Sequence, residues 1–292
     1  MKSLIMKITF FLVFLLPFQF FSQFITSSNL IWLKDSSRID SMVFKNQVYK
    51  SLMYTPREYD SDTSKKWPLI IFLHGKSLTG TRLEKVKKYG VLYSIIRGRK
   101  VPSIVVAPQL TKGPWIPDSL DKYIKSITSN TRIDTSRIAI VGMSLGAYGA
   151  LHYTGKYPNK IAACAAFCGG GNVKDASRLA KVPIWLAHGK KDAAVPFKES
   201  DTLFDAIQKY NSLSTVFSVF PDFGHSQLER LFHRDELYDF LLSNNKWSQF
   251  YFPNFDGDAF EAKVLNKKTE PVYVELVNDK QQIHMDDQLV TD

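Results

Sequence analysis

The sequence predicts an α/β fold with a mostly parallel central sheet, and two observations lead to this prediction. First, six short apolar runs are continuous rather than alternating in polarity, as strands covered on both faces must be. Second, longer segments with apolar residues at three- and four-residue spacing lie between and after these runs. Strands and helices that alternate in this way build a parallel sheet flanked by helices. The runs are Pro68 to Gly75, Ser103 to Pro108, Arg137 to Gly142, Ile161 to Phe167, Val182 to Gly189 and Thr215 to Phe220.

Helical periodicity marks the other segments, and it is found near residues 81–97, 118–129, 145–156, 198–211 and 227–243. Ahead of the first apolar run, Met42 to Pro56 predicts one or two antiparallel edge strands. In a parallel sheet, functional groups gather beyond the carboxyl ends of the strands. The residues that follow each run are therefore the candidates for function.

The composition is that of an ordinary globular chain, since 45% of the 292 residues are hydrophobic and 23% are charged. These values exclude wholesale disorder, collagen and coiled coil. The two cysteines, Cys164 and Cys168, exclude a multi-disulfide scaffold and a four-cysteine zinc site. We expect both to be packed thiols.

The N-terminus differs from the rest of the chain. Residues 1–22 carry Lys2 and Lys7 ahead of an apolar run, Ile8 to Phe21, that is too short to cross the roughly 30 Å core of a bilayer as a helix. This pattern is typical of a secretory signal peptide. It predicts a secreted or periplasmic protein with no stable membrane insertion after cleavage; an uncleaved membrane anchor is the alternative.

The charge is divided between two segments. Residues 246–292 form a short acidic C-terminal appendage with 5 Lys and 9 Asp or Glu, and its only strand-like piece is Val272 to Val277. Residues 23–245 then hold 31 basic and 19 acidic side chains, which the formal charge of +10 for the whole chain conceals. These bases are spread over helices and loops without a nucleic-acid-binding motif. We expect a solvated surface and no nucleic-acid partner; the sequence predicts no oligomeric state.

A nucleophile motif follows the run that ends at Gly142. Gly142-Met143-Ser144-Leu145-Gly146 stands between a predicted strand and a predicted helix. On a sharp strand-to-helix turn, a G-x-S-x-G serine projects its hydroxyl above the sheet, and the glycines allow close approach of the chains. A serine that merely caps the helix is the alternative, but it leaves both glycines unexplained.

A serine nucleophile needs a base, and the base needs an acid that orients it. Asp192 follows the run that ends at Gly189, and His225 follows the run that ends at Phe220. Both residues therefore come directly after a strand, in the chain order serine, acid, histidine. The sequence predicts Ser144 as nucleophile, Asp192 as acid and His225 as base.

Other residues compete for these roles. We expect structural roles for His74 and His188, which each precede a glycine at a strand end, and we expect His188 to shape the acid loop. Asp222 lies three residues before His225 and could instead cap the turn. Asp201 falls inside a predicted helix.

An acyl-transfer site also needs backbone N–H groups that stabilise the oxyanion. One donor is expected from Leu145, directly after the nucleophile, and the other from the loop after the first parallel strand. In the sequence HGKSLTG, that second donor is the backbone of Lys76. The lysine side chain is expected to lie in solvent.

Together these motifs resemble those of an α/β-hydrolase, in the secreted carboxylesterase group with relatives of feruloyl and acetylxylan esterases and of predicted peptidases. The resemblance runs from about Tyr49 to Asn244. It implies the same roles for Ser144, Asp192 and His225. It also implies that Gln109 and Trp115 lie beside the active site as substrate-binding residues, although packing of Trp115 under its own loop is the alternative. The residues that carry the resemblance are SLMYTPREYD, PLIIFLHG, VVAPQL, IDTSRIAIVGMSLGAYGALHYTGKYPNKIAACAAFCGGG, VPIWLAHGKKDAAVP and FPDFGH.

The sequence thus predicts a secreted serine hydrolase that cleaves carboxylic esters through an acyl-enzyme on Ser144, without a metal or an organic cofactor. The resemblance implies a small-molecule or carbohydrate ester as its partner, such as an acyl ester of a polysaccharide or oligosaccharide. Two alternatives stay open. One is a serine peptidase of the prolyl-oligopeptidase type, and the other is a catalytically inactive binding protein on the same fold.

Overall fold

A computed structural model describes residues 30–33, 39–44, 49–246, 250–253, 263–264 and 272–273. The predicted signal peptide, residues 1–22, lies outside these ranges, and so does most of the predicted acidic appendage. No helix among the described residues is long and apolar enough to span a membrane. The division of the chain at residues 22 and 245 stays a prediction.

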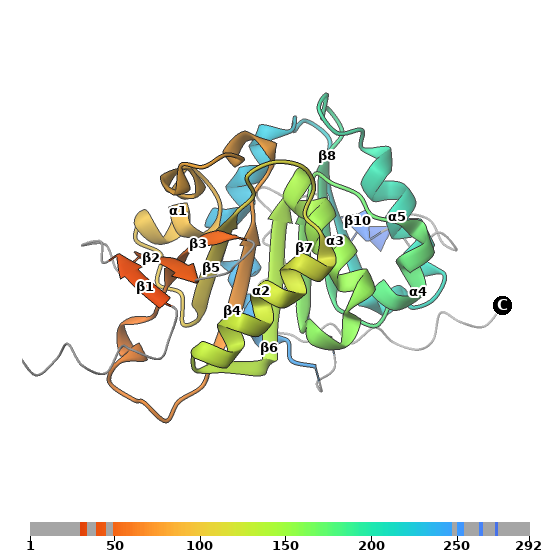
Figure 1. Cartoon of the computed structure of the whole chain (residues 1–292). Coiled ribbons are helices and arrows are strands. Elements are labelled where there is room, and N and C mark those ends of the chain that lie inside the picture. Colours follow the sequence, from red (N-terminus) through yellow and green to blue (C-terminus); the bar gives the residue numbers. More distant parts are fainter. Residues whose placement is uncertain are drawn as a thin grey trace, which may run out of the picture.

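A single nine-stranded sheet forms the centre of the molecule, in the order β1-β2-β3-β5-β4-β6-β7-β8-β9 (Figure 1). The pairs from β5 through β9 are parallel, whereas β1, β2 and β3 are antiparallel to their neighbours. This confirms the predicted mostly parallel sheet with antiparallel strands at one edge. The strands are β1 Leu30–Leu33, β2 Ile39–Phe44, β3 Lys50–Tyr54, β4 Trp67–Leu73, β5 Ile104–Gln109, β6 Ile133–Met143, β7 Ala163–Phe167, β8 Ile184–Gly189 and β9 Thr215–Phe220.

Helices cover both faces of the sheet. In β4, Leu69 and Ile71 belong to one hydrophobic cluster, while Ile70 and Phe72 belong to the other. The first cluster contains residues of α2, α3, α4 and α5, and the second contains residues of α1, α6 and the 3₁₀ helix η7. Every residue of β4 is buried, which explains why its sequence is continuously apolar. The helices are α1 Val91–Ile96, α2 Pro117–Asn130, α3 Leu145–Lys156, α4 Ala176–Leu179, α5 Lys198–Gln208, α6 Asp235–Ser243 and η7 Ser226–His233.

The prediction of one continuous helix near residues 81–97 is wrong. The structure has a 3₁₀ helix, η3 (Leu83–Lys87), and then α1, with Gly90 between them. Gly90 has φ 85°, and a Cβ atom there would lie 2.1 Å from the ring of Phe72. The close approach to β4 thus requires a glycine in a backbone conformation that a helix does not contain.

The helix predicted over 227–243 is also broken, at Arg234, whose backbone is extended (φ −92°, ψ 141°). The carbonyl groups at the end of η7 are bound by other elements instead of by a continuing helix. The Ser94 hydroxyl donates to the Phe232 carbonyl at 2.5 Å, and the Arg99 guanidinium donates to the His233 carbonyl at 2.6 Å. These tertiary contacts end the helix turn, and α6 begins anew at Asp235.

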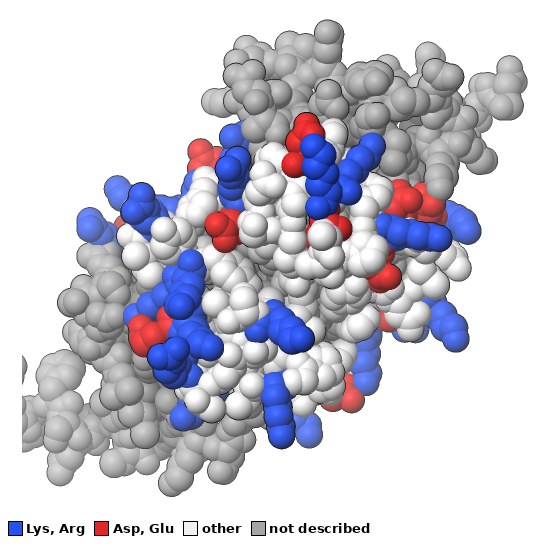
Figure 2. Space-filling model, turned by 90° about the horizontal axis from the view of Figure 1, so that it is seen from above, with Lys and Arg blue, Asp and Glu red and all other residues white. Residues whose placement is uncertain are grey.

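The remaining expectations concern the tail, the cysteines and the surface. Val272–Tyr273 forms β11, paired with β10 (Lys263–Val264), while the rest of the predicted strand lies outside the described residues. Cys164 and Cys168 are buried free thiols, as expected. On the face drawn in Figure 2, the Lys and Arg side chains are dispersed, and Asp or Glu accompanies several of them.

Candidate active site

The predicted nucleophile lies on a strained turn between β6 and α3. Ser144 has φ 56° and ψ −124°, a conformation that non-glycine residues rarely adopt. Its backbone N–H donates to the Phe167 carbonyl of the neighbouring strand β7 at 2.8 Å. The side chain of Ser144 is half-buried, so the hydroxyl stands at the surface of the sheet's carboxyl end.

The flanking glycines are explained by close backbone packing. A Cβ atom on Gly142 would lie 2.1 Å from the Gly146 carbonyl oxygen, and one on Gly146 would lie 1.8 Å from the Leu73 carbonyl oxygen. Either contact is too short for any side chain. The G-x-S-x-G pattern is therefore what allows α3 to begin directly against the ends of β6 and β4, with Ser144 at the apex.

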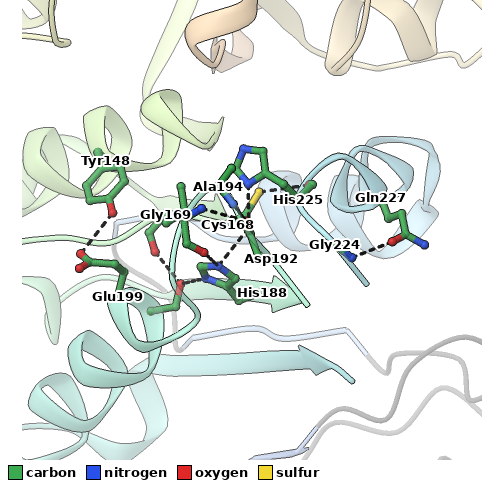
Figure 3. Close-up of polar contacts among 12 residues, drawn as sticks. Tyr148, Cys168, Gly169, His188, Asp192, Ala194, Glu199, Gly224, His225 and Gln227 are labelled. Carbon is green, nitrogen blue, oxygen red and sulfur yellow. Dashed lines mark hydrogen bonds and ion pairs between the residues drawn. The ribbon is translucent and has the colours of Figure 1, made fainter. Parts of the chain in front are cut away.

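The predicted acid and base form a hydrogen bond. His225 Nδ1 lies 2.7 Å from Asp192 Oδ2. Asp192 belongs to the turn after β8, and its side chain is fully buried, whereas the His225 side chain is 25% exposed. The other oxygen of Asp192, Oδ1, accepts the N–H groups of Ala194 and Val195, each at 2.8 Å (Figure 3).

These contacts determine the charge state of Asp192. Burial by itself would raise the pKa of the carboxyl group, but the Val195 N–H, the His225 imidazole and the Ala194 N–H outweigh it. The pKa of Asp192 is therefore below its ordinary value, and the carboxylate is ionised at neutral pH. Because an ionised carboxylate only accepts hydrogen bonds, Nδ1 of His225 carries a proton and Nε2 is the basic nitrogen.

The competing acid, Asp222, does not contact His225. It forms an ion pair with Lys191 at 2.6 Å, and its side chain is 82% exposed. Asp201 lies in the first turn of α5, as predicted. The geometry thus favours Asp192 as the partner of the base.

The predicted oxyanion donors lie beside the nucleophile. Leu145 is the first residue of α3, where backbone N–H groups have no partner within the helix. Lys76 begins the 3₁₀ helix η2 (Lys76–Leu78) directly after Gly75, and a Cβ atom on Gly75 would lie 3.2 Å from Ser144 Cβ. Leu145 thus follows the serine in the chain and Lys76 lies close to it on another segment, while the direction of the two N–H groups stays a prediction.

His74 and Tyr89 hold this second loop in place. The Leu110 N–H donates to His74 Nε2 at 3.0 Å, so the ring proton is on Nδ1, which donates to the Gly75 carbonyl at 2.7 Å. The Gly75 N–H in turn donates to the Tyr89 hydroxyl at 2.6 Å. The expected structural role of His74 is thus the orientation of the peptide group after Gly75, while Tyr89 orients the peptide group before it.

Gln109 and Trp115 support the same loop from below. The Gln109 amide donates to the carbonyls of Leu78 and Arg82 at 3.0 and 2.9 Å, and only 4% of this residue is exposed. Trp115 is 2% exposed, and its indole N–H donates to the His74 carbonyl at 3.2 Å. Both residues lie near the site as expected, but they are packed beneath it; direct contact with a substrate stays a prediction.

Cys168 was not predicted to be near the site. It directly follows β7, has φ 42°, and its thiol lies 3.7 Å from the His225 carbonyl. Burial, with a smaller contribution from Asp192, raises the pKa of this thiol. Ligand atoms of Cys168, Asp192 and His225 lie within 4.8 Å of one another, but a metal ion could use all three only if the Asp192–His225 hydrogen bond were broken.

Comparisons with known proteins find similarity to esterases. Residues 115–243 match the family described as phospholipase/carboxylesterase. A bifunctional acetylxylan esterase/xylanase, XynS20E of Neocallimastix patriciarum, is 34% identical over 86 residues, which make up 29% of this chain and 12% of that enzyme. This chain thus spans a small part of that curated relative.

Solved esterase structures share the fold. A thermostable esterase superposes with a TM-score of 0.61 at 22% identity, covering 74% of this chain and 62% of that one. A ferulic acid esterase superposes with a TM-score of 0.57 at 15% identity, covering 74% of this chain and 99% of that one. At such identities the likeness establishes the architecture, and the chemistry has to be argued from the residues above.

Proposed function

We propose that this chain, whose residues 115–243 match the phospholipase/carboxylesterase family and whose fold is shared with a solved esterase, cleaves carboxylic esters through an acyl-enzyme on Ser144. The observation that carries the proposal is the 2.7 Å hydrogen bond between His225 and Asp192, formed on the same sheet edge as the strained turn of Ser144. A serine, an imidazole with a free basic nitrogen and a buried carboxylate are the three groups that this chemistry requires.

In the first half-reaction, Nε2 of His225 accepts the Ser144 proton while the serine oxygen attacks the ester carbonyl. Asp192 keeps the imidazole in the required tautomer and stabilises the imidazolium ion. The imidazolium then gives the proton to the leaving alcohol, which leaves an acyl group on Ser144. In the second half-reaction, His225 removes a proton from water, and the resulting attack releases the acid and regenerates the serine.

The negative charge that develops on the carbonyl oxygen meets the N–H groups of Leu145 and Lys76. Each such donor typically contributes about 10²- to 10³-fold to turnover. The loop that supplies Lys76 is fixed by His74, Tyr89 and Gln109, so the donor is held in place before the substrate arrives.

The substrate class that we propose is acyl esters of polysaccharides or oligosaccharides. Support comes from the local similarity to a bifunctional acetylxylan esterase/xylanase and from the shared fold with a ferulic acid esterase. Secretion directed by residues 1–22 is part of the same proposal, because such polymers lie outside the cell.

The test is a substrate panel with purified wild-type protein. An aryl acetate, acetylated xylo-oligosaccharides and feruloylated oligosaccharides would be assayed beside peptide amides of similar size, with Ser144→Ala as the control. We expect hydrolysis of the esters, loss of this activity in Ser144→Ala, and much slower cleavage of the amides. Preferential amide cleavage would favour the peptidase alternative, and no hydrolysis of any substrate would favour the inactive binding protein.

A further inference from the structure

The carboxylate of Asp192 lies between two imidazole rings. Its Oδ2 atom is 2.7 Å from His225 Nδ1 and 3.2 Å from His188 Nε2 (Figure 3). The Oδ1 atom is already occupied by the N–H groups of Ala194 and Val195. This buried carboxylate thus accepts three hydrogen bonds, from Ala194, Val195 and His225, and its Oδ2 atom also lies within ion-pair distance of a second histidine, His188.

The neighbours of His188 determine which of its nitrogens carries a proton. Nε2 faces Asp192 Oδ2 and, at 3.0 Å, the Val195 carbonyl oxygen. Both oxygens only accept hydrogen bonds, so Nε2 carries a proton whether the ring is neutral or charged. The single proton on Nε2 is thus shared between the Val195 carbonyl oxygen at 3.0 Å and Oδ2 of the acid at 3.2 Å.

The ring of His188 is held on its other sides as well. Nδ1 lies 2.7 Å from the Ser200 hydroxyl of α5, and this hydroxyl lies 2.6 Å from the Gly169 carbonyl oxygen. The ring also packs edge-on against Phe197, with ring centroids 5.7 Å apart. With no exposed surface, the imidazole is fixed between β8, α5 and the loop after β7.

We propose that His188 is a positioning residue of the active site, whose Nε2–H holds Asp192 with Oδ2 directed at His225 and shares the negative charge of that oxygen with His225. This inference rests on the proposed function. A donor to a carboxylate disperses its negative charge, so Asp192 stabilises the His225 imidazolium less than an unshared carboxylate would. Without that donor, Asp192 keeps its charge but loses one of the contacts that fix its orientation.

The other titratable groups that face this cluster are Cys168, Tyr148 and Glu199. Burial raises the pKa of the Cys168 thiol. Burial, followed by the Glu199 carboxylate that accepts the Tyr148 hydroxyl at 3.2 Å, raises the pKa of Tyr148 to about 12. The Cys168 thiol and the Tyr148 hydroxyl therefore do not titrate in the range of an ordinary histidine and do not contribute to the acid limb of the pH–rate profile.

The experiment uses His188→Phe, which keeps a ring beside Phe197 and removes both nitrogens. We expect kcat for a neutral aryl ester to fall by about 10- to 100-fold, as for losses of other supporting hydrogen-bond partners, with KM changed by no more than about twofold. The acid limb of kcat/KM should move to higher pH. His188→Gln, which places an amide N–H near the position of Nε2, should recover most of kcat and return the limb toward its wild-type position.

The matched control is His233→Phe at the far end of η7, where the His233 ring contacts Ser94 and no residue of the site. It should leave kcat and the pH profile unchanged. Circular dichroism and melting temperature would establish that each variant is folded. Wild-type kcat together with an unshifted acid limb in folded His188→Phe would overturn the positioning role.

A second measurement does not depend on the folding of a variant or on ester hydrolysis. In wild-type protein with ¹⁵N-labelled histidine, a protected imidazole N–H resonance should arise from His188 Nε2 and should shift as His225 titrates. An unprotonated His188 Nε2 would overturn the inference even in an active enzyme. Inactivity of the wild type toward every ester, with this resonance present, would instead contradict the proposed function and leave the protonation of His188 Nε2 established.

Discussion

The same dipeptide, His-Gly, stands directly after β4 and at the very end of β8, and the two positions use it differently. His74 binds only backbone groups, the Gly75 carbonyl and the Leu110 N–H. His188 contacts side chains, Asp192 and Ser200, in addition to one carbonyl. In the proposed mechanism, the first loop presents N–H groups toward a developing negative charge, and the second presents a carboxylate toward a developing positive charge. His-Gly at a strand end is therefore a means of fixing a loop, and the residues that come next decide its chemistry.

The largest effects are expected when the nucleophile or the base is removed. Ser144→Ala and His225→Ala should each lower turnover of an aryl ester by about 10⁶, the scale observed when a triad member is lost in a serine protease. Both variants should bind substrate analogues with affinities close to that of the wild type. Retention of most activity in either variant would show that the loops surround a different nucleophile or base.

The second-largest effect is expected at Asp192, in the loop after β8. Asp192→Asn should lower kcat by about 10⁴, because the amide favours the wrong tautomer of His225. Asp222→Asn is the matched control on the same side of the site; it breaks only an exposed ion pair with Lys191 and should leave kcat nearly unchanged. A larger loss in Asp222→Asn than in Asp192→Asn would reverse the assignment of the acid.

An added methyl group should affect the two loops in different ways. In Gly75→Ala the Cβ atom would lie 2.9 Å from the Tyr89 hydroxyl and 3.2 Å from Ser144 Cβ, so the oxyanion loop should shift and kcat should fall by about a hundredfold. In Gly189→Ala the Cβ atom would lie 2.1 Å from the Phe223 carbonyl oxygen. This clash with backbone should lower the free energy of unfolding by about 1–3 kcal/mol. Steady-state kinetics and denaturant unfolding of both variants would separate the loss of kcat from the loss of stability. Equal losses of stability in the two variants would contradict the expected difference between the loops.

The smallest effect is expected at Lys76. Its proposed contribution is the backbone N–H, which Lys76→Ala retains, so kcat for a neutral ester should stay close to that of the wild type. Measured beside Gly75→Ala, this variant distinguishes a main-chain donor from a side-chain one. A drop as large as that of Gly75→Ala would assign the role to the lysine ammonium group.

Features with a local cause were predicted well from the sequence. The helix expected over 145–156 is α3, Leu145–Lys156, and the apolar runs are strands of one sheet, because periodicity and glycine placement act over a few residues. The chain order of Ser144, Asp192 and His225 placed candidates at three strand ends, and the sheet brings the acid and base into contact. The unexpected features depend on distant residues: Gly90 breaks a helix because the Phe72 ring lies against it, and Arg234 ends one because Arg99 and Ser94 bind the preceding carbonyls.

The depth of Gln109 and Trp115 and the position of Cys168 could not be predicted for the same reason. A motif indicates that a residue is near a site, but burial is decided by what packs over it, here Leu78 and Arg82 over Gln109, and His74 and Tyr49 against Trp115. His188 is intermediate: its place before Gly189 indicated that it shapes the acid loop, and only the three-dimensional contacts show that it shares Asp192 with the base.

The most direct test of the account is covalent labelling with a fluorophosphonate probe. Wild-type protein should react, and mass spectrometry of the digested adduct should locate the probe on Ser144. Ser144→Ala should not react, and Asp192→Asn should react far more slowly than Asp222→Asn. A wild-type protein that resists the probe, or an adduct on another residue, would contradict the assignment of Ser144 as an activated nucleophile.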